Sequence, residues 1–174
     1  MHGTQENAPA PEPRIRNRLL YDKPMQTTSR TFTLIKPNAV AAEATGKILD
    51  RLIADGFRIR ALKMDFLSRN RAARFYAVHR GKPFFEDLVR FMTSGAVVAA
   101  VLERDGERAV EALRTLVGAT DPARAAAGTI RREFGESVTR NAIHASDSPE
   151  NAREEWSRFF TPDEITEIDY TPEV

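Results

Sequence analysis

The sequence predicts an α+β protein of the ferredoxin-like, split βαβ type: a four-stranded antiparallel sheet with helices packed on one of its faces. Two observations carry this prediction. Short β-rich runs alternate with segments of helical period, in the order strand, helix, strand, helical pair, strand, helix, strand. At 174 residues, 41% of them hydrophobic, the chain also has the length of one domain with a sizeable core.

Four segments have the composition or the alternation of strands. Residues 31–36 are a short β-rich run, and residues 57–67 alternate in part between apolar and polar side chains. Residues 96–103 are almost continuously apolar, as is typical of a buried strand. A fourth possible strand lies near residues 140–145.

Helical patterns fill the intervals, at residues 44–55, 69–80, 83–94, 107–117 and 149–160. Gly56 and Gly118 are stop signals, and Pro83 suits the first turn of its helix. Ser148 is an N-cap followed by proline at the first helical position. The stretch at 119–128 has no clear period.

Residues 1–30 differ from the rest of the chain, because they hold four of its ten prolines and almost no apolar periodicity. We interpret them as an N-terminal extension to a domain at residues 31–174. Composition favours a mobile tail, whereas the basic stretch at 14–21 would suit docking on the domain, a neighbouring subunit or an acidic partner. Met25 is an alternative start of the protein.

The composition excludes several functions. The 26 Lys and Arg residues against 25 Asp and Glu give a charge of +1, which argues against a nucleic-acid partner. The absence of cysteine excludes a disulfide scaffold, a thiolate zinc site and a cysteine nucleophile. No apolar run approaches the roughly 18–20 residues of a membrane span, and no signal segment is evident. We therefore expect a cytoplasmic protein without a membrane partner.

One histidine is in a position suited to phosphate chemistry. His144 ends a predicted strand directly before a helix N-terminus, whose unpaired N–H groups suit an anion. Glu155 falls beside Trp156 within the apolar stripe of that helix, where a carboxylate needs a partner. A carboxylate that fixes one ring nitrogen leaves the other free as a nucleophile. The alternatives are a structural histidine and a solvated Glu155.

Two arginines and a hydroxyl group could clamp a polyphosphate. Arg114 and Arg131 flank the aperiodic loop that holds Thr120, and guanidinium groups match phosphate oxygens in geometry and charge. The alternative is that these arginines lie on the solvated surface, because the chain is rich in arginine. The sequence around Gly46 lacks the Walker A spacing, and no Rossmann, G-x-S-x-G or H-E-x-x-H motif is present.

Residues 141–148, Asn-Ala-Ile-His-Ala-Ser-Asp-Ser, closely resemble the active-site segment N-x-x-H-G-S-D-S of nucleoside diphosphate kinases. Four more segments match that family in order, and the resemblance covers about residues 31–168. These segments are residues 33–37, Tyr76 through Pro83-Phe84-Phe85, Ser94-Gly95 with the strand after it, and 120–122 leading to 128–131.

The resemblance implies ping-pong transfer of the γ-phosphoryl group from a nucleoside triphosphate to a nucleoside diphosphate through a phosphohistidine at His144. Glu155 would orient that histidine, Ser146 would hydrogen-bond Glu155, and Tyr76 would lie near the imidazole. A nucleotide-binding regulatory protein on the same fold, with little or no turnover, is the alternative function.

The resemblance also assigns the nucleotide contacts. Lys36 and Asn141 would contact the ribose hydroxyls, and Lys36 would also reach toward the phosphates. The phosphate clamp would comprise Arg114, Thr120 and Arg131. Phe84 would stack on the base whatever its identity, since every base offers a π-face. Taken singly, these residues also suit core, capping or surface roles.

Magnesium is the implied cofactor, carried mainly by the nucleotide phosphates and in part by Asp147 through water. Family members are usually hexamers or tetramers, and the sequence does not choose between them. Three departures from the family pattern stand near the motif: Ala145 and Thr139 replace glycines, and Arg132-Glu133 replaces a smaller pair. If the glycine at position 145 has a positive φ, a methyl group there costs free energy.

Overall fold

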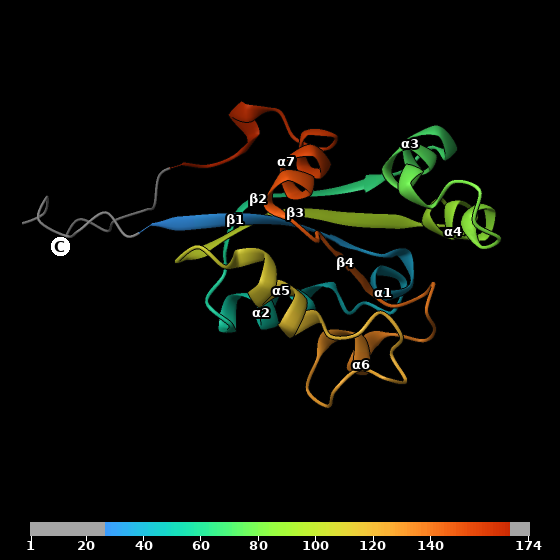
Figure 1. Ribbon diagram of the computed structural model, residues 1–174, viewed down its shortest axis with the longest axis horizontal. Coiled ribbons are helices and arrows are strands. Elements are labelled where there is room, and N and C mark those ends of the chain that lie inside the picture. Colours follow the sequence, from blue (N-terminus) through green and yellow to red (C-terminus); the bar gives the residue numbers. More distant parts are fainter. Residues whose placement is uncertain (1–26, 168–174) are drawn as a thin grey trace, which may run out of the picture.

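The computed structural model describes residues 27–167, which form an α+β sandwich around one antiparallel sheet (Figure 1). The strand order is β2-β3-β1-β4, as a split βαβ fold requires. The strands are β1 (Thr28–Ile35), β2 (Arg58–Phe66), β3 (Ala96–Asp105) and β4 (Ile143–Ala145). β1 pairs with β3 along its whole length and with β4 at one end, where Leu34 lies opposite His144. The predicted fold class is confirmed.

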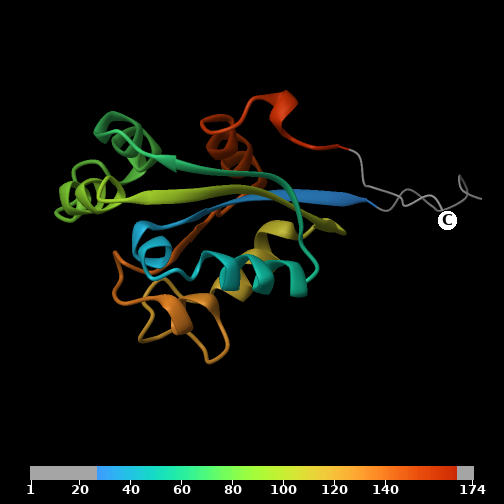
Figure 2. The same ribbon diagram turned by 180° about the vertical axis from the view of Figure 1, so that it is seen from behind.

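Helices cover both faces of the sheet (Figure 1, Figure 2), so the expectation of helices on one face was wrong. One face carries α3 (Arg69–Phe75), α4 (Phe85–Met92) and α7 (Pro149–Ser157). The other carries α1 (Pro37–Ala41), α2 (Thr45–Ala54), α5 (Ala109–Val117) and α6 (Ile130–Phe134). The reason lies in β3, where residues 97–102 are all buried and alternate between two cores.

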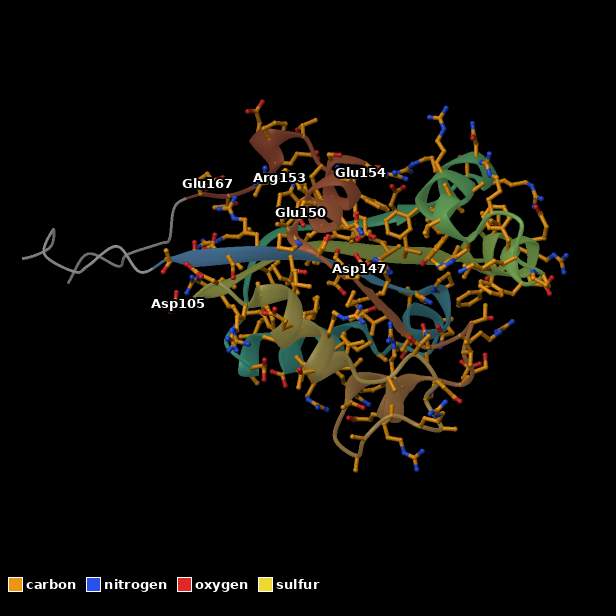
Figure 3. All side chains as sticks on the ribbon, viewed as in Figure 1. Asp105, Asp147, Glu150, Arg153, Glu154 and Glu167 are labelled. Atoms are coloured by element: carbon orange, nitrogen blue, oxygen red, sulfur yellow. The ribbon has the colours of Figure 1, made fainter. Side chains whose placement is uncertain are left out.

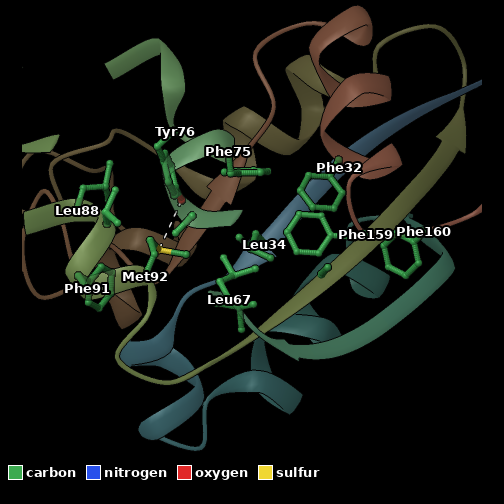
Figure 4. Packing of buried hydrophobic residues seen from close by; sticks show 14 of the residues in the cluster. Phe32, Leu34, Leu67, Phe75, Tyr76, Leu88, Phe91, Met92, Phe159 and Phe160 are labelled. Atoms are coloured by element: carbon green, nitrogen blue, oxygen red, sulfur yellow. Dashed lines mark hydrogen bonds between the residues drawn. The ribbon is translucent and has the colours of Figure 1, made fainter. Parts of the chain in front are cut away.

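An aromatic core fills the face beneath α3 and α7 (Figure 4). The ring centroids of Phe32 and Phe159 lie 5.3 Å apart, and Phe75 lies 6.1 Å from Phe32. Each such side chain contributes about 1.5–3 kcal/mol by leaving water. The imidazole of His144 on β4 packs against this core, because Phe32 and Phe75 also contact its ring.

The predicted elements are present with shifted boundaries. The helix predicted at 69–80 ends at Phe75 and continues as a 3-10 turn, Ala77–His79. β4 has only three residues, because Ala142 has a φ of +69° and interrupts the extended backbone before it. The short α1, α6 and the 3-10 turn Pro162–Glu164 were not predicted, since elements this short leave no periodic signal.

Local signals fix several helix ends. Ser148 caps α7 by accepting a hydrogen bond from the Asn151 amide at 3.0 Å. Gly118 ends α5 with a φ of +86°, and a Cβ there would lie 2.5 Å from Thr129 Oγ1, so only glycine fits. Pro83 lies in the turn before α4 rather than in its first helical turn.

Residues 28–30 of the predicted extension form the start of β1. The remainder through residue 26, with the basic stretch and Met25, lies outside the described residues. Between residues 27 and 167, no helix has the length and apolar character needed to cross a membrane.

Candidate active site

His144, the middle residue of β4, contacts a carboxylate of α7. Its Nε2 atom lies 2.9 Å from Oε2 of Glu155, and about a fifth of each side chain is exposed (20% and 18%). Glu155 lies in the last turns of α7, on the side that packs toward the sheet with the fully buried Ala152. The contact that helical spacing predicted between the two residues is present.

A serine completes the support of this carboxylate. The Ser146 hydroxyl, which is fully buried, lies 2.5 Å from the same Glu155 oxygen and 3.2 Å from the carbonyl oxygen of Phe32. An ionised carboxylate accepts hydrogen bonds only, so the imidazole donates from Nε2. The lone pair then resides on Nδ1, which has no hydrogen-bond partner among residues 27–167.

Aromatic rings hold the imidazole from the side. Phe75 meets it edge-on at 5.1 Å and 78°, and Tyr76 at 6.2 Å and 89°. The Tyr76 hydroxyl donates to Met92 Sδ at 3.6 Å rather than to the histidine (Figure 4). Burial raises the pKa of Tyr76 well above its ordinary value, so the phenol is neutral and acts here through packing.

Lys36 and Asn141 form a buried pair beside β4. Lys36 Nζ donates to Asn141 Oδ1 at 2.6 Å and to the Thr139 carbonyl at 3.3 Å. Asn141 in turn donates to the Thr120 carbonyl at 2.9 Å, which ties the aperiodic loop to the site. Burial, with a smaller contribution from Arg131, lowers the pKa of Lys36 to about 7. Lys36 therefore gains and loses its charge near neutral pH.

Arg131, in the first turn of α6, is bound to the backbone on both sides of the site. It donates two hydrogen bonds to the Ile143 carbonyl, at 3.0 and 3.2 Å, and one to the Gly118 carbonyl at 3.0 Å. Burial and the nearby Arg114 lower the pKa of Arg131 to about 10. Arg114 and Thr120 are exposed, and neither side chain has a hydrogen-bond partner within the described part. All three predicted clamp residues thus lie around the same part of the structure.

Phe84 offers a partly open aromatic face just before α4, with 45% of its surface exposed. Its ring lies 5.5 Å from that of His79, and Lys82 Nζ lies 5.8 Å from its centroid. His79 also stacks on Tyr76 at 6.3 Å, although it was not among the predicted site residues. Its spacing of three residues from Tyr76 was the available signal.

The departures from the family pattern are accommodated. Ala145 lies in β4 opposite Thr33 and does not have a positive φ, so its methyl group causes no backbone strain. Thr139 contributes its carbonyl to Lys36, which any residue would supply. Arg132 and Glu133 make outer contacts, to the Pro122 and Ala123 carbonyls and to Arg51.

Residues 27–167 hold no group of three His, Asp or Glu side chains able to bind an ion, so this part of the chain does not form a metal cage by itself. Asp147 is exposed just before α7 (Figure 3) and accepts a hydrogen bond from Asn151 Nδ2 at 2.6 Å. Its second carboxylate oxygen accepts no hydrogen bond within that range, which suits a single water-mediated contact to a magnesium ion held by phosphates.

An antiparallel ferredoxin-like sheet with a carboxylate-bound histidine beside lysine and arginine defines the class, a phosphate-handling α+β enzyme. The family model described as nucleoside diphosphate kinase matches residues 29–165. The chain therefore belongs to the nucleoside diphosphate kinase family. It is a phosphotransferase of nucleotide metabolism, with nucleoside diphosphate kinase activity.

Curated relatives and solved structures agree with this assignment. The chain is 55% identical to the nucleoside diphosphate kinase of Nitratiruptor over 136 residues, which are 78% of this chain and 98% of that protein. The Aquifex aeolicus enzyme has 48% identity, a TM-score of 0.76 and coverage of 80% of this chain and 100% of its own. The Halobacterium salinarum enzyme, solved with CDP, has 38% identity, a TM-score of 0.77 and coverage of 83% and 95%.

Proposed function

We propose that this kinase transfers the γ-phosphoryl group through a phosphohistidine formed at Nδ1 of His144. The hydrogen bond between Nε2 and Glu155 carries the proposal, because it directs the lone pair to the other ring nitrogen. Ser146 holds the same carboxylate oxygen, so the imidazole is oriented before substrate binds.

In the first half-reaction, Nδ1 attacks the γ-phosphorus, and the bond to the β–γ bridging oxygen breaks. The nucleoside diphosphate leaves with that electron pair, while the proton stays on Nε2, hydrogen-bonded to Glu155. In the second half-reaction, a terminal oxygen of an acceptor diphosphate attacks the phosphohistidine and releases the neutral imidazole. One site serves both steps because the donor and the acceptor each contain a nucleoside diphosphate, which can bind in the same way.

The cationic residues would stabilise the transferring group. We propose that Arg114, Thr120 and Arg131 clamp the phosphates, with Arg131 held in place by backbone carbonyls. Lys36 would reach both the phosphates and the ribose hydroxyls, with Asn141 beside it. An arriving polyphosphate would raise the pKa of Lys36 and so recover its positive charge.

The exposed face of Phe84 would stack on the base, which supports broad base tolerance. The CDP complex of the halophilic relative supports a nucleoside diphosphate as ligand here. Magnesium, bound to the phosphates and to Asp147 through water, would neutralise phosphate charge.

We also propose a homo-oligomer, a hexamer or a tetramer. β2 is an edge strand of the sheet, and its alternate residues Leu62, Met64 and Phe66 are all exposed. An exposed apolar edge strand is a surface that proteins normally cover. The cytoplasmic location, the lack of membrane and nucleic-acid partners, and the division into residues 1–30 and 31–174 remain predictions.

The test is the intact mass of the protein after brief incubation with ATP and Mg²⁺, followed by GDP. We expect a gain of one acid-labile phosphoryl group that disappears as GTP forms. His144→Gln should abolish the gain, whereas the matched control His79→Gln should keep it. A phosphoryl group that never passes to GDP would favour the regulatory alternative, and labelling of His144→Gln would contradict the mechanism.

A further inference from the structure

A cavity of about 620 Å³ lies between α3, the end of β2 and the end of α7, a size that suits a small ligand. None of the proposed catalytic or nucleotide-binding residues lines it. Its apolar floor comprises Leu67, Phe75 and Phe159, which Figure 4 shows within the aromatic core, and Ala77. Its other lining residues are Arg71, Arg74, Arg80 and Arg158.

The charge of this cavity is strongly one-sided. Four of its eight lining residues are arginines, and none is acidic. Arg71 is paired with Asp65 at 2.7 Å, and Arg158 with Glu154 at 2.5 Å. Arg74 and Arg80 have no carboxylate partner among residues 27–167. Two guanidinium groups are therefore available to an anion at an apolar opening.

We propose that this arginine-lined cavity binds a soluble anionic amphiphile, a molecule with one carboxylate or phosphate group on an apolar body. The guanidinium forks of Arg74 and Arg80 would bind the anionic group. The apolar body would pack on Phe75 and Phe159, where the Arg71 guanidinium already lies 5.5 Å from the Phe159 ring. A nucleotide, with its polar ribose and several charges, suits this floor less well.

The cavity shares a wall with the proposed active site. Phe75 lines the cavity and also meets the His144 ring edge-on at 5.1 Å. A ligand packed against Phe75 would therefore change the surroundings of the imidazole. Only this coupling step rests on the proposed function of His144, because binding itself requires no phosphoryl transfer.

The experiment measures binding of decanoate and of decyl phosphate, below their micelle concentrations, by isothermal titration calorimetry of the full chain. We expect one site per chain, with saturating ADP leaving binding in place. Decanol and inorganic phosphate should bind at least tenfold more weakly, since each lacks one half of the recognised chemistry. Vesicles of phosphatidylglycerol test a lipid surface as the source of the anion.

The double variant Arg74→Gln/Arg80→Gln should bind decanoate at least tenfold more weakly, while Arg74→Lys/Arg80→Lys should recover part of the affinity. The matched control is Arg153→Gln, which removes an exposed charge from α7 outside the cavity (Figure 3). Equal binding by the double variant, equal binding of decanol, displacement by ADP or binding to vesicles alone would each overturn the proposal.

Imidazole resonances of His144, assigned with His144→Gln, give the readout of coupling. Decanoate should shift them in the wild-type protein and leave them unchanged in the double variant. Binding without any shift would overturn the coupling and leave the phosphohistidine mechanism untouched. If the wild-type protein binds decanoate but transfers no phosphoryl group, the proposed function is contradicted instead.

Discussion

Oε2 of Glu155 accepts from both His144 Nε2, at 2.9 Å, and Ser146 Oγ, at 2.5 Å. One oxygen atom thus joins the last helix to β4, and the backbone N–H of Ser146 donates to the Phe32 carbonyl of β1. Because β4 is only three residues long, we expect this contact to contribute to the orientation of the imidazole.

Glu155→Gln should lower the rate of phosphohistidine formation about 10- to 100-fold, since an amide orients the imidazole less strongly than a carboxylate. Rapid-quench measurement of the phosphoenzyme checks this expectation. The matched control is Glu150→Gln, an exposed carboxylate on the same helix (Figure 3). A Glu155→Gln rate within twofold of wild type would show that the contact does not position the nucleophile.

The buried Lys36 should make stability depend on pH. Burial lowers its pKa from 10.5 to about 7, so between these values the unfolded chain binds a proton that the folded chain lacks. The free energy of unfolding therefore rises with pH in this window. Lys36→Met should reduce the slope between pH 7 and 9.5 by up to about 1.4 kcal/mol per pH unit.

Urea unfolding at several pH values measures that slope. Lys47→Met, which removes an exposed lysine from α2, should leave it unchanged. The same slope in Lys36→Met as in the wild-type protein would mean that Lys36 is charged in the folded state at neutral pH.

Local sequence signals were sufficient for much of this arrangement. The pairing of His144 with Glu155 followed from a strand end and a helical spacing only 11 residues apart. The order of strands and helices likewise predicted the sheet. The second helical layer did not follow, because an apolar run indicates burial without showing what covers each face.

Contacts between distant segments were beyond the sequence patterns. Lys36 meets Asn141 across 105 positions, and only the pairing of β1 with β4 brings them together. The hydrogen bond from the Tyr76 hydroxyl to Met92 could not be predicted either, since it depends on how α3 and α4 pack. The resemblance to a known family assigned these residues to one site without their local contacts.

Two alanines of the motif should respond oppositely to glycine. Ala142 has a φ of +69°, where glycine relieves strain. Ala145 lies in the extended β4, where glycine lowers stability because it increases the backbone entropy of the unfolded chain. Both methyl groups are buried, so their loss largely cancels in the comparison. Ala142→Gly should be more stable than Ala145→Gly by about 1–2 kcal/mol in urea unfolding. Equal stabilities would contradict the strain at Ala142.

A buried carboxylate at the far end of the sheet should matter more for stability than any surface pair. Glu103 on β3 lies 2.8 Å from Arg30 and 2.7 Å from Arg60, and it is almost fully buried. Glu103→Gln removes the buried carboxylate that both guanidinium groups contact. It should reduce the free energy of unfolding by about 3–5 kcal/mol.

The matched control for Glu103 is Asp105→Asn, two residues along the same strand. Asp105 pairs with Arg58 at 2.8 Å, but 56% of its side chain is exposed, so its loss should cost at most about 1 kcal/mol. Urea unfolding of both variants compares the two costs directly. Similar losses would show that the guanidinium groups around Glu103 reach water easily once the carboxylate is gone. Turnover at low temperature should survive in both, because Glu103 and Asp105 contact none of the proposed catalytic residues.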